Sequence, residues 1–338
     1  MADSSPTHRD SDLVPTPGGD DRHAHLMLSR SILDRDSLRR EDPSLLQSLL
    51  SSPRTRVLHL RGERMPVTTQ GDVVRLLLRA PQPADSDLPA AYLGRQEGAD
   101  FVAVFDVPER KVPGDAGTTD PDDLARQSER THRSLRSLAP GLPVADLGLA
   151  TTSVAMANWV ATQRFCARCG RPVALTKAGW VMTCDEGHHH FPRTDAAVIM
   201  SVVDPDDRLL LAQGTRFVLP TGMSVLAGFL EPGESMEAAV AREVMEEVGL
   251  PIVEAEYVGN QPWPMPASLM IGYAARTDET RLRLDPVEIR TARWFTRAQL
   301  EDALAGGELT VPPRLSIARH LIERWYGAAL PAQPGDVS

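Results

Sequence analysis

Three glutamates in the C-terminal half are spaced so that one helix could present their carboxylates together. Glu243, Glu246 and Glu247 stand at i, i+3 and i+4, and at about 3.6 residues per turn these positions share a helix face. Carboxylates this close repel one another unless a cation lies among them. Hard divalent cations such as Mg²⁺ and Mn²⁺ prefer oxygen ligands, so the spacing predicts a metal site. Ions held there can neutralise a diphosphate and activate water for in-line attack on phosphorus.

The segment around these glutamates has the pattern of an amphipathic helix that follows a glycine-rich loop. We expect a helix over Ser235–Val248, ended by Gly249 in a left-handed conformation. Its second face is an apolar stripe that can pack on a sheet, formed by Ala241, Val244 and Val248. The loop Gly228–Gly233 can bring backbone groups close to a ligand. We interpret Arg242 as a partner that orients a neighbouring carboxylate.

Gly228, Glu234 and the run Arg242–Leu250 match every fixed position of the Nudix box, so the chain resembles Nudix hydrolases. The resemblance implies that the three glutamates are catalytic ligands for Mg²⁺ or Mn²⁺. It also implies that the carbonyl of Ala227 joins the metal shell. The alternative is a solvated helix face, which is what most charge runs are. The joint match at so many constrained positions favours an active site.

Within this site we expect Glu247 to be the central ligand, with Glu243 beside it. Glu246 is either a third ligand or a group that orients water, and the sequence leaves both roles open. The resemblance implies one more metal carboxylate outside the box, Glu288, which precedes the pair Trp294-Phe295.

A proline-rich tract downstream of the box limits the range of expected substrates. It resembles the SQPWPFPxS motif of the NADH pyrophosphatase (NudC-type) branch, with Asn260 in place of Ser and Met265 in place of Phe. Its prolines stiffen the backbone, so it can act as a preformed wall for a nucleotide; the alternative is a rigid turn that caps the sheet. The residues predicted to bind substrate are Gln261, Pro262, Trp263, Pro264, Met265, Pro266, Ala267 and Ser268.

The resemblance assigns four further substrate contacts. Phe229 matches an aromatic residue that stacks on nicotinamide, and Phe191 matches one supplied by the partner subunit of a homodimer. Ala318 matches a backbone contact near the nucleotide, and Arg136 matches an arginine of the N-terminal domain. Stacking of this kind favours a flat ring. The implied substrates are NADH and NAD⁺, cleaved to NMN(H) and AMP, and NAD-capped RNA, which carries the same diphosphate.

A Cys/His segment precedes the Nudix part. Cys166, Cys169 and Cys184, with His188 four positions after the last of them, resemble a zinc ribbon, because thiolates and imidazole suit tetrahedral Zn²⁺. The usual second C-x-x-C is replaced by a run of three histidines. We choose His188 as the fourth ligand, with His189 as the alternative, and an empty, degenerate site is the competing reading. A closed four-ligand site would be structural.

Composition limits the class of protein. The 338 residues are 42% hydrophobic and carry a formal net charge of −10, which argues against a broad nucleic-acid-binding surface. No stretch approaches the roughly 20 apolar residues of a membrane helix, and we expect neither a membrane contact nor a secretory signal peptide. An odd number of cysteines with one C-x-x-C favours metal over a disulfide. We therefore expect a cytoplasmic protein.

The fold class expected is α/β (α+β): a Nudix α/β/α sandwich with a mixed sheet, preceded by a zinc ribbon and a smaller N-terminal α/β domain that serves as scaffold or dimerisation domain. The expected divisions are a disordered tail at 1–25, the N-terminal domain at 26–162, the ribbon at 163–193, the Nudix domain at 194–328 and a flexible tail at 329–338.

Periodicity predicts the elements of these domains. The expected strands are Arg56–Leu60, Val73–Leu78, Phe101–Val107, Ala197–Val203, Leu209–Gln213, Ser268–Arg276 and Arg290–Phe295. Besides the helix that carries the glutamates, the expected helices are Asp120–Leu138, Leu147–Thr162, Arg297–Ala305 and Leu315–Trp325.

Two other functions compete with NAD(H) cleavage. One is a Nudix pyrophosphatase for another nucleoside diphosphate derivative, such as ADP-ribose or a diadenosine polyphosphate. The other is a zinc-ribbon RNA-binding module that retains an inactive Nudix fold, against which the intact carboxylates count.

Overall fold

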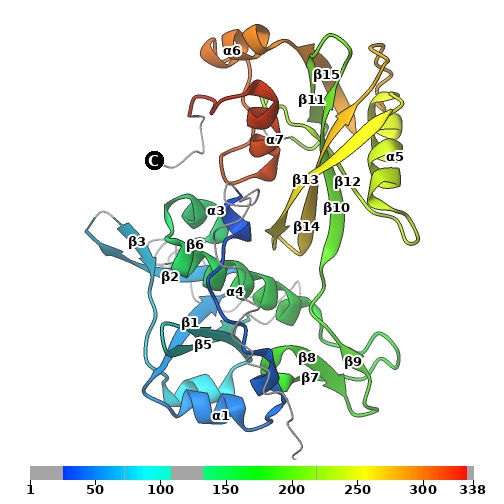
Figure 1. The fold of residues 1–338 in the computed structure, drawn as a ribbon. Coiled ribbons are helices and arrows are strands. Elements are labelled where there is room, and N and C mark those ends of the chain that lie inside the picture. The colour runs from blue at the N-terminus through cyan, green and yellow to red at the C-terminus, as the bar shows by residue number, and fades with distance from the viewer. Residues whose placement is uncertain (1–25, 72, 108–131, 218, 333–338) are drawn as a thin grey trace, which may run out of the picture.

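The computed structural model describes residues 26–71, 73–107, 132–217 and 219–332 (Figure 1). The predicted N-terminal tail lies outside these ranges, as do residues 333–338 of the predicted C-terminal tail. Residues 329–332 are described, and Leu330 is 2% exposed against the core. This part of the expected flexible tail is therefore packed, because a leucine there finds an apolar surface. In the described ranges, no helix has both the length and the apolar character needed to cross a bilayer.

The N-terminal domain is built on a sheet with strand order β3-β2-β1-β5-β4, and β6 also pairs with β2. β1 and β5 run parallel, whereas β4 and β5 run antiparallel. The three predicted strands in this domain are present with shifted ends. Its elements are η1 Met27–Ser29, η2 Ser37–Glu41, α1 Leu45–Leu50, β1 Thr55–Arg61, β2 Arg64–Gln70, β3 Val73–Leu76, η3 Pro83–Asp87, β4 Ala90–Gln96, β5 Ala99–Asp106, β6 His132–Ser134, α3 Leu135–Leu138, η4 Ala139–Gly141 and α4 Val144–Thr162.

Helix α4 is the central helix of this domain. Small and apolar residues on all its sides let it be buried along most of its length, and it begins three residues before the predicted start at Leu147. The helix predicted over Asp120–Leu138 is wrong in part. Residues 120–131 lie outside the described ranges, and His132–Ser134 form a strand because their backbone groups pair with β2. Only α3 is helical there.

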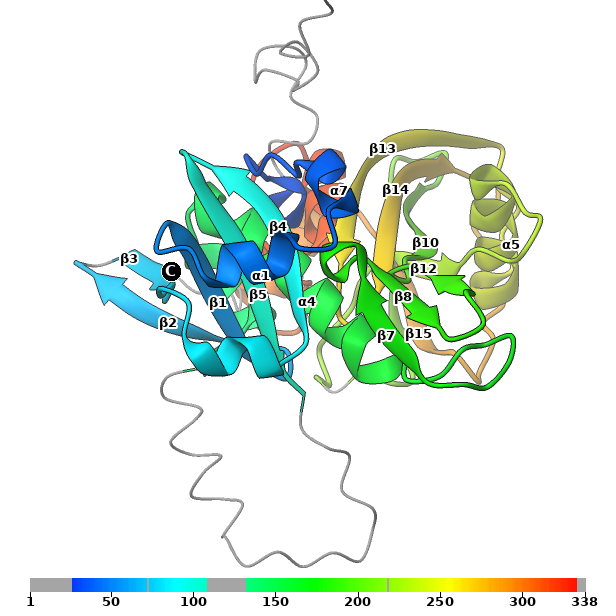
Figure 2. The same ribbon diagram turned by 90° about the horizontal axis from the view of Figure 1, so that it is seen from below.

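The Cys/His segment forms a small three-stranded sheet that docks on the N-terminal domain (Figure 2). Trp180 donates its indole N–H to the carbonyl of Tyr92 at 2.7 Å. Gly179 has no room for a side chain, because a Cβ would lie 2.4 Å from the carbonyl oxygen of Ala90. The segment is therefore held closely against β4. Its elements are β7 Val173–Thr176, η5 Lys177–Gly179, β8 Val181–Cys184 and β9 His189–His190.

The Nudix domain is a mixed sheet between helices, as predicted. Its strand order is β13-β14-β10-β11-β15, with β12 paired to β10 and with β10 parallel to β14. α5 covers one face, and α6 and α7 cover the other (Figure 1). Its elements are β10 Asp195–Val203, β11 Leu209–Gly214, β12 Leu226–Phe229, α5 Met236–Val248, β13 Glu254–Trp263, β14 Ser268–Arg276, β15 Ile289–Phe295, α6 Arg297–Ala305 and α7 Ile317–Tyr326.

Strands β12 and β13 were not predicted. β13 contains part of the proline-rich tract that was expected to be a loop. The sequence suggests a stiff loop over Gln261–Ser268, but its first three residues belong to β13 and Ser268 begins β14. β13 ends the sheet order, and prolines are tolerated in edge strands because only one side of the backbone must pair. The tract is therefore the tip of a β-hairpin.

Candidate active site and metal centre

Helix α5 positions the glutamates, and it is fixed at both ends. The Ser235 hydroxyl accepts a hydrogen bond from the Ala238 N–H at 3.2 Å, and Gly249 ends the helix at φ 71°. Glu243 and Glu247 are only 9% and 7% exposed, whereas the side chain of Glu246 is 59% exposed. The three carboxylates therefore do not share one environment: two face the sheet and one faces solvent.

Gly228 on β12 is the close neighbour of this carboxylate pair. A Cβ built at Gly228 would lie 1.8 Å from the carboxyl carbon of Glu243, so only glycine allows the strand and the carboxylate to approach in this way. β12 pairs antiparallel with β10, with Gly228 opposite Val198. The preceding residue, Ala227, lines the same cavity as Glu243.

The carboxylates open onto a cavity of about 590 Å³. Glu288 reaches it from the segment before β15, which is tied to Thr215 by two hydrogen bonds. The Thr215 N–H donates to the Glu288 carbonyl at 2.8 Å, and its hydroxyl donates to the Val287 carbonyl at 2.9 Å. Of the predicted catalytic and metal residues, the cavity is lined by Ala227, Glu243, Glu247 and Glu288.

Burial and like charge dominate the electrostatics of the cavity. Burial, together with the charges of Glu243, Glu288 and Asp285, raises the pKa of Glu247 to about 8. Burial also raises the pKa of Glu243, although Arg242 opposes this change. The Oε2 atom of Glu247 is buried and has no hydrogen-bond partner in the described structure. A buried, unpartnered carboxylate oxygen among other carboxylates fits a bound divalent cation.

Arg242 holds the loop and the helix together. Its guanidinium donates two hydrogen bonds to the carboxylate of Glu234, at 2.8 and 2.9 Å. It also donates to Glu243 at 2.8 Å, to Glu246 at 3.1 Å and to the carbonyl of Phe229 at 2.9 Å. Such a forked pairing fixes geometry as well as charge, so Arg242 lies where an orienting residue is expected.

The residues predicted to contact substrate lie in two different parts of the structure. Phe229 is 59% exposed and lines the carboxylate cavity. The tract and Arg136 lie elsewhere: the Arg136 guanidinium is 5.3 Å from the ring centre of Trp263, and the Asn158 side chain donates to the Pro264 carbonyl at 2.8 Å. The hairpin tip therefore packs on the N-terminal domain.

Three other members of the predicted contact set also lie away from the carboxylates. Gln261 is fully buried and bonds the Leu315 carbonyl at 2.8 Å and the Ile317 N–H at 2.7 Å. Ala318, one residue further along α7, is 3% exposed. Phe191 is 68% exposed after the ribbon. One chain thus brings Phe229, but not these residues, to the carboxylate cavity.

Two residues that line the cavity escaped the sequence analysis. Arg216 and Phe217 follow β11 and line the same cavity as the loop that follows β12. No motif marks them; their position in the loop directly after a predicted strand is the available signal, since binding and catalytic residues are often on loops.

The Cys/His group has the dimensions of a tetrahedral zinc site. The ligand atoms of Cys166, Cys169, Cys184 and His188 all lie within 4.8 Å of one another. The distance is 3.7 Å from Cys169 Sγ to Cys184 Sγ, and 3.5 Å from His188 Nδ1 to both Cys166 Sγ and Cys184 Sγ. Zn–S and Zn–N bonds of about 2.3 and 2.0 Å give tetrahedron edges of about 3.8 Å and 3.5 Å, so the donor set fits zinc.

The alternative ligand His189 is placed differently. It is exposed, and its Nδ1 lies 3.0 Å from the hydroxyl of Thr183. The geometry therefore favours His188 as the fourth member of the group.

Comparisons with known proteins agree with this arrangement. Residues 192–314 match the model of the NUDIX domain, and residues 161–191 match that of the NADH pyrophosphatase zinc ribbon domain. A NUDIX hydrolase structure from Nitrosomonas europaea is 19% identical with a TM-score of 0.39, covering 51% of this chain and 96% of that one. The matched NUDIX domain and the motif together define a Nudix hydrolase, a class that implies a divalent metal.

Two relatives narrow the class. The NAD-capped RNA hydrolase NudC of Mycobacterium bovis (strain BCG / Pasteur 1173P2) is 36% identical over 311 residues, which are 88% of this chain and 94% of that protein. The NAD-capped RNA hydrolase NUDT12 of Macaca fascicularis is 38% identical over 221 residues, 60% of this chain but only 47% of that protein. The chain belongs to the NADH pyrophosphatase (NudC-type) family of Nudix hydrolases.

Proposed function

We propose that this protein cleaves the diphosphate of NAD(H) to NMN(H) and AMP, and that it removes NAD caps from the 5′ ends of RNA. The observation that carries the proposal is the buried pair Glu243 and Glu247, which faces an open cavity together with Glu288. The names of the relatives support the choice of substrate.

In this mechanism, Glu243, Glu247, Glu288 and the carbonyl of Ala227 would hold the catalytic cations, which we propose to be Mg²⁺ or Mn²⁺ because every donor is an oxygen. Bound cations supply charge neutralisation of the diphosphate and a water of lowered pKa. Because its pKa is raised to about 8, Glu247 would have to be ionised to hold a cation, and Arg242 keeps Glu243 in place.

Glu246 has a secondary role in this proposal. Its carboxylate is exposed and already accepts a hydrogen bond from Arg242, which supports an outer ligand or a group that orients water. Phe229, exposed at the rim of the cavity, stacks on the nicotinamide ring.

One of the remaining contacts, Phe191, comes from a second copy of the chain in this proposal. We propose a homodimer in which Phe191 of one protomer faces the site of its partner, which its exposed side chain permits. Arg136, Ala318 and the hairpin tip Gln261–Ser268 then contact the nucleotide. Zn²⁺ held by the Cys/His group fixes the ribbon that carries Phe191. A cytoplasmic location stays a prediction from the sequence.

The experiment is a substrate panel with Mg²⁺ or Mn²⁺ that contains NADH, NAD⁺, ADP-ribose, a diadenosine polyphosphate and NAD-capped RNA. We expect AMP and NMN(H) from the free dinucleotides and a 5′-monophosphate RNA from the capped RNA. If only ADP-ribose or the diadenosine compound is cleaved, the substrate assignment is wrong.

A further inference from the structure

Arg242 is one of the two arginines among the described residues that line the carboxylate cavity, and the protein itself engages it fully. Its guanidinium donates two hydrogen bonds to the first and one to each of the other groups in this set: Glu234, Glu243, Glu246 and the Phe229 carbonyl. A guanidinium has five N–H groups, so all of them are used. Arg242 therefore has no donor left for a substrate.

Arg216, the second of these arginines, has all its donors free. Its side chain is exposed and lines the cavity, yet within the described residues it forms no hydrogen bond, ion pair or ring contact. Three carboxylates line the same cavity: Glu243, Glu247 and Glu288. Because Arg216 pairs with none of them, it does not compete with cations for their oxygens, and its own N–H groups are open to a ligand.

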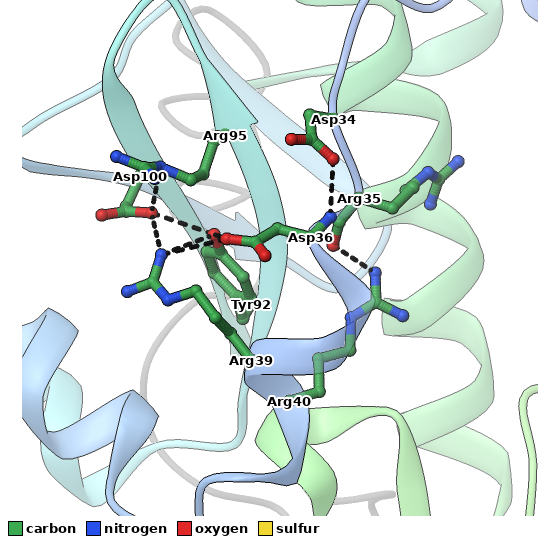
Figure 3. A network of polar contacts seen from close by, with 8 residues as sticks. All are labelled: Asp34, Arg35, Asp36, Arg39, Arg40, Tyr92, Arg95 and Asp100. Atoms are coloured by element: carbon green, nitrogen blue, oxygen red, sulfur yellow. Dashed lines mark hydrogen bonds and ion pairs between the residues drawn. The ribbon is translucent and has the colours of Figure 1, made fainter. Parts of the chain in front are cut away.

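Arginines of the N-terminal domain show two ordinary ways in which a guanidinium is satisfied by the chain. Arg39 pairs with a carboxylate, that of Asp100, at 2.8 Å (Figure 3). The second kind lies over the ring of Trp180, with guanidinium carbons 5.7 and 3.9 Å from the ring centre: Arg35 and Arg40. An aromatic ring stabilises a cation above its face. Arg216 has neither kind of partner among the described residues, which favours a ligand as its partner.

The residue before Arg216 ties it to the proposed metal site. Thr215 donates its N–H to the Glu288 carbonyl at 2.8 Å, and its own carbonyl accepts a hydrogen bond from the Arg290 guanidinium at 2.9 Å. The side chain of Arg216 therefore extends from a backbone position that is fixed beside Glu288.

The residue after Arg216 closes the loop into a tight turn. Phe217 donates its N–H to the Gly214 carbonyl at 3.1 Å. Its ring lies against Gly222, where a Cβ would be 3.0 Å from Cδ1. The buried Gln213 side chain donates to two carbonyls on the far side of the loop, at 3.1 and 2.8 Å. The backbone around Arg216 is thus preorganised, which lowers the entropy lost when its side chain binds a ligand.

The chemistry of diphosphate cleavage needs a donor of this kind. Breaking the diphosphate moves negative charge toward the bridging oxygen that leaves. A group that stabilises this charge must already be in place with free donors. A free guanidinium offers phosphate oxygens two parallel, charge-assisted hydrogen bonds. Arg242 has no donor to spare, so Arg216 is the arginine of the described cavity that can supply them.

We propose that Arg216 is a catalytic residue, whose guanidinium binds the phosphoryl group that leaves and stabilises the charge that develops on it. Water adds to one phosphorus, and the bond from that phosphorus to the bridging oxygen breaks. The electron pair goes to the bridging oxygen, which leaves as part of the second phosphate, and the protons of the water pass to the products and to solvent. The inference rests on the proposed cleavage of NAD(H), and it adds a residue that lies outside the Nudix box.

The test compares Arg216→Gln and Arg216→Lys with the parent protein. We expect kcat on NADH to fall about 100-fold in Arg216→Gln, the scale of losing one donor that stabilises developing charge. Arg216→Lys keeps the charge but not the planar fork, so its kcat should fall about tenfold. Arg281→Gln is the control and should match the parent, because it removes the same charge from an exposed position outside the carboxylate cavity.

A titration with Mg²⁺ separates a phosphate contact from an indirect effect through Glu288. A displaced Glu288 would raise the Mg²⁺ concentration that gives half the maximal rate, because a cation ligand would be out of place. Loss of a phosphate contact would leave this concentration unchanged. We expect the Arg216→Gln and parent proteins to have the same Mg²⁺ requirement.

Binding of an NAD analogue whose bridging oxygen is replaced by a methylene group is the readout that needs no cleavage. Isothermal titration calorimetry in the presence of Mg²⁺ measures it. We expect Arg216→Gln to bind the analogue about tenfold more weakly, because charged hydrogen bonds are lost. Arg281→Gln should bind it as the parent does.

Two results would overturn the inference. Unchanged kcat and unchanged analogue binding in Arg216→Gln would mean that this arginine faces solvent only. A Mg²⁺ requirement that rises in step with the loss of rate would mean that Arg216 acts by holding Glu288. The proposed function fails separately: a parent protein that binds the analogue through Arg216 but cleaves no NADH would keep the phosphate contact and lose the activity.

Discussion

The two metal-binding regions of the molecule differ in how complete they are. In the Cys/His group, four ligand atoms already lie at distances that suit the corners of a tetrahedron. Around Glu247, the carboxylates border an open cavity of about 590 Å³, and one buried oxygen lacks a partner. A closed site has no position for substrate, whereas an open one leaves room for water and a diphosphate. The comparison therefore predicts a structural metal in the Cys/His group and a catalytic metal in the carboxylate cavity.

Glu247→Gln should give the largest effect in this comparison. The change keeps the shape of the side chain but removes the charge of the most buried carboxylate in the cavity. We expect kcat on NADH to fall about 1,000-fold or more, the scale seen when a key electrostatic group of a site is lost. Steady-state kinetics at saturating Mg²⁺ measure this loss.

The matched control is Glu246→Gln, on the same helix but exposed. We expect a much smaller loss of kcat from it. Equal losses in the two variants would remove the distinction between buried and exposed glutamates.

Gly228→Ala should give the next largest effect. The added methyl group would lie 1.8 Å from the carboxyl carbon of Glu243, so the helix and β12 must separate. We expect kcat/KM on NADH to fall about 100-fold, since small displacements of a site are costly, and Mg²⁺ to be required at higher concentration. Gly141→Ala is the control, because a Cβ there meets no atom within 4 Å. A Gly228→Ala protein with normal activity would show that the close contact is not needed.

The contrast between these regions also shows what local sequence can predict. Helix α5 and its cap were predictable because periodicity, Ser235 and Gly249 all act within the segment itself. The ribbon ligands were predictable because their spacing is short. Arg35, Arg40 and Trp180 meet only through long-range packing, so no local pattern marks them. The hairpin tip was predicted as stiff but not as a contact with the N-terminal domain, for the same reason.

Cys184→Ser tests the closed region and should change the rate little. We expect the zinc content of the purified protein to fall from about one ion per chain to well below one, because a buried ligand is lost. The melting temperature should fall by several degrees, while kcat on NADH changes less than tenfold. Metal analysis and thermal melting measure the first two quantities. A loss of kcat as large as that of Glu247→Gln would place the ribbon in the chemistry.

The smallest effect concerns stability without Mg²⁺ or Mn²⁺. The folded protein raises the pKa of Glu247 from its ordinary value of 4.5 to about 8, so between these pH values the folded state keeps a proton that the unfolded state loses. Stability should therefore fall as pH rises through this window, by a few kcal/mol at most above pH 8. Glu247→Gln has no charge to bury, so it should melt at a higher temperature than the parent at pH 9 and at the same temperature at pH 4.

Saturating Mg²⁺ provides the control for this difference, because a bound cation offsets the buried charge and should abolish the advantage of the variant at pH 9. Thermal melts of parent and variant, with and without Mg²⁺, measure both quantities. A variant less stable than the parent at pH 9 without Mg²⁺ would mean that Glu247 is already satisfied by other groups. The carboxylate cavity would then be like the Cys/His group in having its buried polar atoms already satisfied.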